Sequence, residues 1–202
     1  MEKFLALPKE KQDTIVEAGY ACFAQMGYKK ASVADIAAKA GISTAMIFHY
    51  FGSKKKMYFF LMERASEEFE QILSEYGIPK EADCFDRLMA ENKCKCLMLK
   101  KHPAILAFLL SIFAEEDEEV KAKQKELVWQ KRNSLEVQGI DPKECLRFKE
   151  GVDPQLVIHL VTNYVENIAR KAALGQISDM DSVWEDVSAC FAMLEKHLLK
   201  EI

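Results

Sequence analysis

The chain has 202 residues, of which 50% are hydrophobic and 30% are charged, and its formal net charge is −4. This length allows one or two domains with hydrophobic cores. No apolar run is long enough to cross a bilayer, and the N-terminus lacks a signal-peptide pattern. The sequence therefore predicts a soluble cytoplasmic protein and argues against a membrane-spanning one.

The first predicted helix begins at Pro8, after a short N-terminal arm, because proline suits the first position of a helix. An apolar stripe at helical spacing follows, and Gly27 is expected to end the helix. The members of this stripe are Ile15, Ala18, Cys22, Phe23 and Met26. We interpret the helix as a scaffold that supports the segment after it.

The segment from Ser32 to Lys56 has the pattern of two short helices joined by a sharp turn. Ser32 and Asp35 can form a capping box, because the hydroxyl and the carboxylate satisfy amide donors at the helix start. Gly41 can adopt a positive φ and end the first helix, and Ser43 can cap the second. The expected inner face consists of Ile36, Ala37, Ala40, Ile42, Ile47 and Tyr50 or Phe51. This pattern predicts a helix-turn-helix.

The second short helix is expected to present small or polar side chains outward. Thr44, Ala45 and His49 could approach base edges in a major groove. Five residues at and after its end are suited to phosphate oxygens: Tyr50, Ser53, Lys54, Lys55 and Lys56. The full set of predicted DNA-binding residues is Ser32, Ser43, Thr44, Ala45, Phe48, His49, Tyr50 and Lys54.

Charge is distributed unevenly along the chain. Residues 1–56 hold nine Lys against five acidic residues, a net charge of +4, and the remainder of the chain carries −8. A basic head on an acidic body favours approach to DNA through the head. Taken alone, the lysine run at residues 54–56 would more simply be a solvated surface. Its position directly after a helix-turn-helix pattern favours a role at DNA.

These residues resemble the DNA-binding head of TetR-family transcriptional regulators. The matching positions are Ser32, Ile36, Ala37, Ala40-Gly41-Ile42-Ser43, Ile47-Phe48-His49-Tyr50-Phe51 and Ser53-Lys54, with Ala18, Phe23 and Gly27-Tyr28 upstream. Two positions depart from the family pattern: Ala45 stands where Gly is common, and Phe48 where a Tyr often offers its hydroxyl to a phosphate. The resemblance is strong over residues 10–60 and only architectural beyond them.

The rest of the chain has the pattern of an all-α fold, without alternating strand signals. A long helix is expected from Lys54 to about Tyr76, ended by Gly77-Ile78-Pro79. Further helices are expected near residues 85–99, 104–114, 120–137, 154–175 and from about 180, with a short one around 143–148. The acidic block Glu115–Glu119 is interpreted as a solvated turn and helix start. Metal binding there is the less favoured alternative, because the block lacks the spacing of an oxygen-ligand loop.

We therefore predict two functional domains. Residues 1–53 form a helix-turn-helix DNA-binding domain, and residues 54–202 form a helical effector-binding and dimerisation domain. The resemblance implies that the last two long helices pack against their symmetry mates as a homodimer. The alternative from the residues alone is that their apolar stripes face their own core.

An effector pocket is expected among the central helices of the second domain. Its candidate residues are Met89, Phe108, Phe113, Trp129, His159, Asn163, Tyr164 and Glu166, with Cys96 as a further possibility. Aromatic and Met residues at helical spacing also make ordinary helical cores, which is the simpler interpretation of most of them. His159, Asn163 and Glu166 are the polar exceptions, and they would need hydrogen-bond partners if buried.

The resemblance implies a ligand-responsive repressor that binds a palindromic DNA operator as a dimer and is released by a small-molecule effector of unknown identity. An enzyme is the rival from another class, but the sequence shows no nucleophile beside a base, no metal cluster and no phosphate-binding glycine loop. A ligand-binding or interaction module whose head no longer binds DNA is the second alternative, which the Phe48 departure keeps open.

The six cysteines, at positions 22, 84, 94, 96, 145 and 190, show no spacing typical of a disulfide framework or a zinc site. Cys94 and Cys96 would point well apart on a helix, so one metal could not easily bind both. We expect buried or inert thiols, with redox or metal sensing as the alternative. No metal and no cofactor is predicted.

Overall fold

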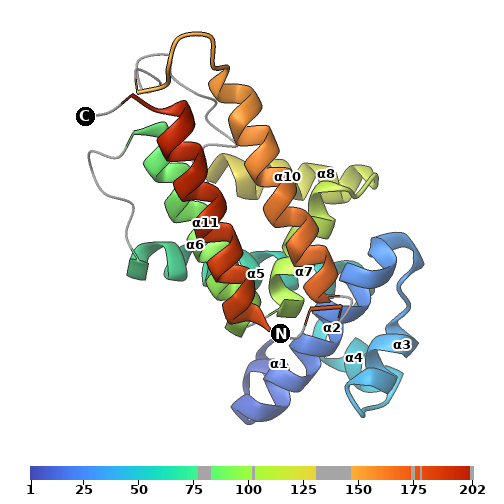
Figure 1. Cartoon of the computed structure of the whole chain (residues 1–202). Helices are drawn as coiled ribbons and strands as arrows, with labels where there is room; N and C mark the ends of the chain where they lie inside the picture. The colour runs from blue at the N-terminus through green and yellow to red at the C-terminus, as the bar shows by residue number, and fades with distance from the viewer. Residues whose placement is uncertain (77–82, 102, 131–146, 174–175, 178, 201–202) are drawn as a thin grey trace. The chain divides into compact units, whose positions relative to one another are not determined.

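The computed structural model describes residues 1–76, 83–101, 103–130, 147–173, 176–177 and 179–200 (Figure 1). Its helices are α1 (Glu2–Leu5), α2 (Lys9–Lys30), α3 (Val33–Lys39), α4 (Thr44–Phe51), α5 (Lys54–Tyr76), α6 (Cys84–Lys101), α7 (Pro103–Phe113), α8 (Glu118–Gln130), α10 (Pro154–Ala173) and α11 (Met180–Leu198). Within those described ranges there is no strand, only an isolated antiparallel bridge between Phe148 and Leu199. The all-α prediction is confirmed.

The helix boundaries follow the sequence signals closely. α5 begins at the predicted residue, Lys54, and is helical up to Tyr76, the last residue described before position 83. α2 begins one residue later than predicted, with Pro8 at the N-cap, and Gly27 breaks its helical geometry with a φ of 74°. The predicted break at residues 77–79, the end of the 120–137 helix and most of the short helix around 143–148 lie outside the described residues.

Packing divides the chain into two compact units. The first unit consists of Met1–Glu68 and Ala104–Leu127, and the second of Phe69–Pro103 and Val128–Ile202. This division differs from the predicted functional boundary between residues 53 and 54, because the start of α5 and most of α7 pack together with the N-terminal helices. The functional boundary itself stays a prediction.

An aromatic cluster joins α2, α5 and α7 within the first unit. The ring of Tyr58 lies 4.7 Å from that of Phe23 and 5.2 Å from that of Phe108. Tyr20 lies 5.1 Å from Phe108 on the other side. These four side chains are at most 1% exposed, and aromatic contacts of this kind add to the free energy gained by burial. A helix distant in sequence thus completes the core of the first unit.

The N-terminal arm is part of the same core. Residues 2–5 form the short helix α1, and its Phe4 is fully buried. The Phe4 ring lies 4.8 Å from Phe51 at the end of α4 and 5.4 Å from Phe60 on α5. This arm therefore fixes the end of α4 against the start of α5.

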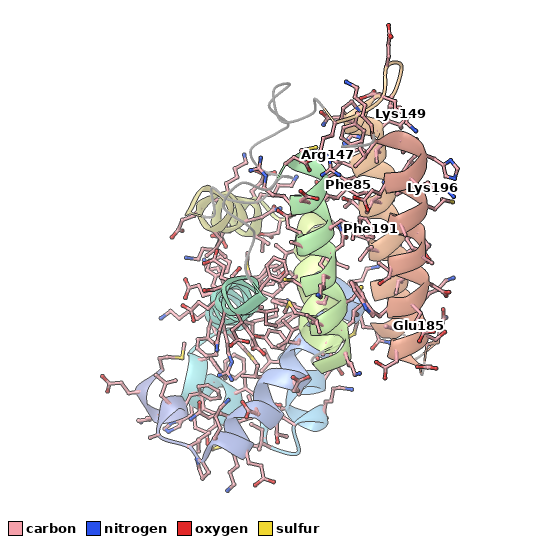
Figure 2. The ribbon with its side chains drawn as sticks, turned by 60° about the vertical axis from the view of Figure 1, so that its left-hand side comes forward. Phe85, Arg147, Lys149, Glu185, Phe191 and Lys196 are labelled. Carbon is pink, nitrogen blue, oxygen red and sulfur yellow. The ribbon has the colours of Figure 1, made fainter. Side chains whose placement is uncertain are left out.

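In the second unit, α10 and α11 run side by side along α6 (Figure 1, Figure 2). Figure 2 shows Phe85, Arg147 and Phe191 gathered toward one end of these helices. Phe85 packs 6.0 Å from Phe191, and the Arg147 guanidinium pairs with Asp83 at 2.7 Å and with Glu195 at 3.2 Å. Arg147, which precedes α10, therefore links the start of α6 to α11 through ion pairs.

Candidate nucleic-acid interface

The helix-turn-helix is fixed by the caps that the sequence indicates. The Ser32 hydroxyl accepts the Asp35 N–H at 3.1 Å and donates to the Asp35 carboxylate at 2.6 Å. Gly41 turns the chain with a φ of 68°, and the Ser43 hydroxyl accepts the Met46 N–H at the start of α4. A Ser N-cap of this kind is worth about 1 kcal/mol. The predicted motif is therefore present, although the Asp35 carboxylate bonds the Ser32 hydroxyl, not a backbone amide.

The helix α4 divides cleanly into a buried and an exposed face. Ile47, Tyr50 and Phe51 are at most 7% exposed and pack into the first unit. Ala45, Met46, Phe48 and His49 are exposed, and Thr44 is half-buried. The outward orientation expected for Ala45 and His49 is observed, while Met46 is an exposed residue that the sequence analysis did not include. Helical periodicity could have indicated it, because Met46 lies three residues before His49, which was expected to face outward.

The Lys54 side chain donates hydrogen bonds to backbone carbonyl oxygens of its own chain. Its ammonium donates to the carbonyl oxygens of Tyr28 at 2.8 Å, Ala31 at 3.2 Å and Lys29 at 3.3 Å, and it lies 4.7 Å above the Tyr28 ring. An ammonium has three donors, and all three are used here. The prediction that Lys54 contacts a phosphate conflicts with this arrangement, since a phosphate would have to displace these carbonyls.

The remaining predicted DNA contacts differ in their access to solvent. Tyr50 is 7% exposed and its ring lies 6.2 Å from that of Phe4, so most of it belongs to the core. Phe48 is 47% exposed. Ser32 is half-buried and Ser43 exposed, each engaged in its cap. Contacts from these residues to DNA stay predictions.

Two exposed lysines follow α4. Lys55 pairs with Glu119 at 3.0 Å, and the hydrogen bond to that carboxylate raises the pKa of Lys55. Both partners are exposed, so the pair is weak and screened by salt. Lys56 lies with its side chain beside Gly52, and within the described residues it forms no ion pair. Lys56 is therefore better placed than Lys54 to meet a phosphate.

The acidic block Glu115–Glu119 contacts the head, which the sequence analysis did not anticipate. The Glu115 carboxylate accepts the Tyr28 N–H at 2.8 Å and also the Glu116 and Asp117 amides. Asp117 caps α8 by accepting the Glu119 and Val120 amides, so the predicted helix start is confirmed. The interpretation of the whole block as solvated is wrong for Glu115, because its partner lies 87 positions earlier and no local pattern reports it.

The predicted effector residues do not share one environment. Phe108 is fully buried in the aromatic cluster of the first unit. Met89 and Glu166 are half-buried on α6 and α10. The side chains of Phe113 and Trp129 lie outside the described residues. These placements leave the pocket composition a prediction.

Three of the predicted pocket residues, His159, Asn163 and Tyr164, do not lie on the buried face of α10. His159 and Asn163 are exposed, and Tyr164 is 41% exposed. The inner face of α10 instead consists of Val157, Ile158, Val161, Val165 and Ile168. α10 carries apolar residues on two faces, and periodicity does not say which one is inside.

One open groove of about 800 Å³ runs along α2 in the first unit. Its lining is Glu10, Asp13, Thr14, Glu17, Ala18, Ala21 and Lys39, none of which was predicted to bind an effector. The groove is therefore separate from the predicted pocket residues.

The described cysteines are free. Cys22, Cys84, Cys94 and Cys96 are buried, and Cys190 is half-buried. Burial raises the pKa of Cys94 and of Cys96 to about 11, so both are thiols at neutral pH. Over the described ranges, no three His, Cys, Asp or Glu residues meet in a way that could hold a metal ion, and none of the helices could span a membrane. Cys145 lies outside these ranges.

Comparison with known sequences identifies the same region. Residues 15–59 match the sequence profile described as bacterial regulatory proteins, tetR family. The chain is 32% identical over 71 residues to the transcriptional repressor AcnR of Corynebacterium efficiens, and 30% identical over 79 residues to the repressor Rv1474c of Mycobacterium tuberculosis. The match to AcnR covers 35% of this chain and 38% of AcnR. The match to Rv1474c covers 36% of this chain and 42% of Rv1474c. Sequence similarity is thus confined to less than half of these relatives.

Solved structures extend the similarity to the whole fold. A TetR-family regulator from Chloroflexus aurantiacus is 18% identical to this chain and superposes on it with a TM-score of 0.62. The superposition covers 100% of this chain and 99% of the regulator. The ketosteroid regulator KstR2 of Mycobacterium tuberculosis shares 17% identity over 96% of this chain and 97% of its own, with a TM-score of 0.61. At this level of identity the likeness concerns the fold alone.

Proposed function

We propose, from the chain's membership of the TetR family of bacterial regulatory proteins, that it is a repressor which binds a palindromic operator as a homodimer and is released by a small molecule. Members of this family are DNA-binding transcriptional regulators and not enzymes. The observation that carries the proposal is the capped helix α4, which buries Ile47 and Phe51 and leaves Ala45, Phe48 and His49 exposed. A recognition helix needs such a free face to enter a major groove.

The dimer part of the proposal is supported by an apolar surface on α10 and α11. Leu156, Leu160 and Tyr164 are 55%, 63% and 41% exposed, and they follow one another at helical spacing along α10. Met193 on α11 is 54% exposed. Exposed apolar side chains that share a helix face are typical of interaction sites, and a two-fold axis would bury the same patch on both copies. The opposite face of α10 fills the chain's own core, so the proposed dimer contact and the core use different faces of this helix.

A dimer determines the form of the operator. Two recognition helices related by a two-fold axis read half-sites about 34–36 Å apart, one DNA turn, or a multiple of that distance. The operator is therefore palindromic. The dimer then has two states, one with the head separation that fits the operator and one with a different separation. An effector that prefers the second state lowers operator affinity. The size of this decrease is set by the ratio of the effector's affinities for the two states.

The test is selection of duplexes from a random-sequence pool, followed by anisotropy titrations of the selected duplex across a salt series. We expect an inverted repeat, two protomers per duplex and an affinity that falls steeply with salt, because phosphate contacts release counterions. Lys56→Ala should lower the salt slope by about one, whereas Lys125→Ala, which removes an exposed lysine on α8, should not. Enrichment of no sequence, or a salt-independent titration, would refute operator binding.

The second candidate, a module whose head no longer binds DNA, is favoured by one set of observations. Phe48 has no hydroxyl, the Tyr50 ring is buried, and Lys54 is committed to backbone carbonyls. Three phosphate contacts available from the family pattern are thus weak or absent. The same selection decides between the candidates, since the module would retain no duplex at any salt concentration.

A further inference from the structure

We infer that the recognition helix α4 reads thymine methyl groups, so that each operator half-site places A·T pairs opposite Met46 and Phe48. This inference rests on the proposed function and names the base chemistry that the same surface recognises. It follows from the side chains that α4 exposes and from those that it lacks.

The polar readers of bases are missing from α4. Its sequence, TAMIFHYF, contains no Arg, Lys, Asn, Gln, Asp or Glu. Guanine is usually read by Arg or Lys, adenine by Asn or Gln, and cytosine by an acidic side chain, each through hydrogen bonds to base edges. Only Thr44 and His49 remain as hydrogen-bonding side chains outside the buried face, because Tyr50 is 7% exposed. Hydrogen bonds from this helix can therefore specify few positions.

The exposed face of α4 is instead apolar. Met46 is 37% exposed and Phe48 is 47% exposed. They lie at the two edges of the exposed arc of the helix, with Ala45 and His49 between them. Thymine is the base that presents an apolar group, its C5 methyl, in the major groove, and it is contacted by Ala, by the Thr methyl and by Phe. The long thioether of Met and the ring of Phe each reach farther from the helix than Ala does, so they can cover methyl groups on neighbouring base pairs.

The charge around this face fits a DNA duplex better than an apolar protein partner. Lys29, Lys30 and Lys39 are exposed in the same unit, and Lys56 lies beside Gly52 at the end of α4. Among the residues that the structure describes, these four lysines form no ion pair. Exposed apolar side chains on α4, in a unit that also carries lysines without an ion pair, suit methyl groups in a groove between two phosphate backbones.

The decisive experiment removes the methyl groups and nothing else. In the duplex obtained by selection, thymine is replaced by uracil one position at a time within the half-site, which deletes the C5 methyl and retains base pairing. We expect at least two half-site positions where uracil weakens binding, by about fourfold for each methyl removed from a fully buried contact. Uracil outside the half-sites serves as the matched control and should have no effect.

Protein variants then assign the methyl contacts to residues. Met46→Ala and Phe48→Ala should each lower the affinity for the thymine duplex and abolish the discrimination between thymine and uracil at one position. Both side chains are exposed, so the fold should be retained. Lys56→Ala should weaken both duplexes equally, because its partner is a phosphate.

The outcomes separate the inference from the proposed function. If the thymine duplex binds and uracil is equivalent at every half-site position, the inference is overturned while operator binding stands. If discrimination persists unchanged in both Ala variants, the assignment to Met46 and Phe48 is overturned. If no duplex binds at all, the proposed function fails first.

Discussion

Two side chains hold the backbone of Tyr28 from opposite directions. Glu115 accepts its N–H at 2.8 Å and Lys54 donates to its carbonyl oxygen at 2.8 Å. Tyr28 lies between Gly27, where α2 is interrupted, and the start of α3. The orientation of the helix-turn-helix relative to α5 and α7 therefore depends on a few hydrogen bonds at this junction.

Replacing Glu115 by Ala should weaken operator binding without changing the number of phosphate contacts. The substitution leaves the Tyr28 N–H and two further amides without their acceptor, at a cost of about 1–3 kcal/mol. Anisotropy should show a lower affinity with an unchanged salt slope. Glu116→Ala makes the same change in charge at an exposed position and is the control. Glu115→Gln should restore part of the affinity, since its amide oxygen can accept one N–H.

Replacing Lys54 by Met should destabilise the first unit. Methionine retains much of the aliphatic length but donates no hydrogen bond to the three carbonyls, and hydrogen bonds to charged groups contribute about 1.5–3 kcal/mol. Urea denaturation should show a lower midpoint than that of Lys56→Met, whose side chain is exposed. A midpoint equal to the control, together with a reduced salt slope, would indicate that Lys54 contacts phosphate after all.

At the scale of elements, the sequence predicted the helix-turn-helix well because its signals are local. Ser32, Gly41 and Ser43 each act within a few residues of themselves, so cap and turn chemistry fixes them without knowledge of the fold. The burial of Phe4 and the contact of Glu115 with Tyr28 could not be predicted in this way. Each depends on a partner far away in the sequence.

The helix α10 shows where periodicity is ambiguous. Val161 and Val165 fill the core of the second unit, whereas Leu156, Leu160 and Tyr164 form an exposed stripe. Both sets repeat every three or four residues, so the sequence could not say which faces inward. The predicted polar pocket residues His159 and Asn163 lie exposed for the same reason.

Replacing Leu160 by Glu should convert the dimer to a monomer. The side chain is 63% exposed in the single chain, so folding should tolerate a carboxylate, but the proposed interface would bury it. Sedimentation velocity should show half the mass of the wild-type protein with an unchanged helical circular-dichroism spectrum. Leu5→Glu, at a leucine of 55% exposure on α1, should remain dimeric. Identical oligomeric states for the two variants would rule out α10 as the interface.

At the scale of the whole molecule, the packing units and the predicted functional domains are not the same. The first unit takes its core from residues 1–68 and from residues 104–127, so Phe108 and Glu115 belong with the DNA-binding helices. The family profile covers residues 15–59, and the likeness over the rest of the chain is one of fold. The segment 104–127 is therefore part of the packing unit that holds the helix-turn-helix, together with the start of α5.

Hydroxyl-radical footprinting of the selected operator tests the central claim, that two copies of α4 enter one face of a duplex. The account predicts two protected windows, related by the palindrome and about 10–10.5 base pairs or a multiple of that distance apart. The combined variant Met46→Ala, Phe48→Ala should lose both windows together. A single protected window, or protection that survives this variant undiminished, would contradict the account.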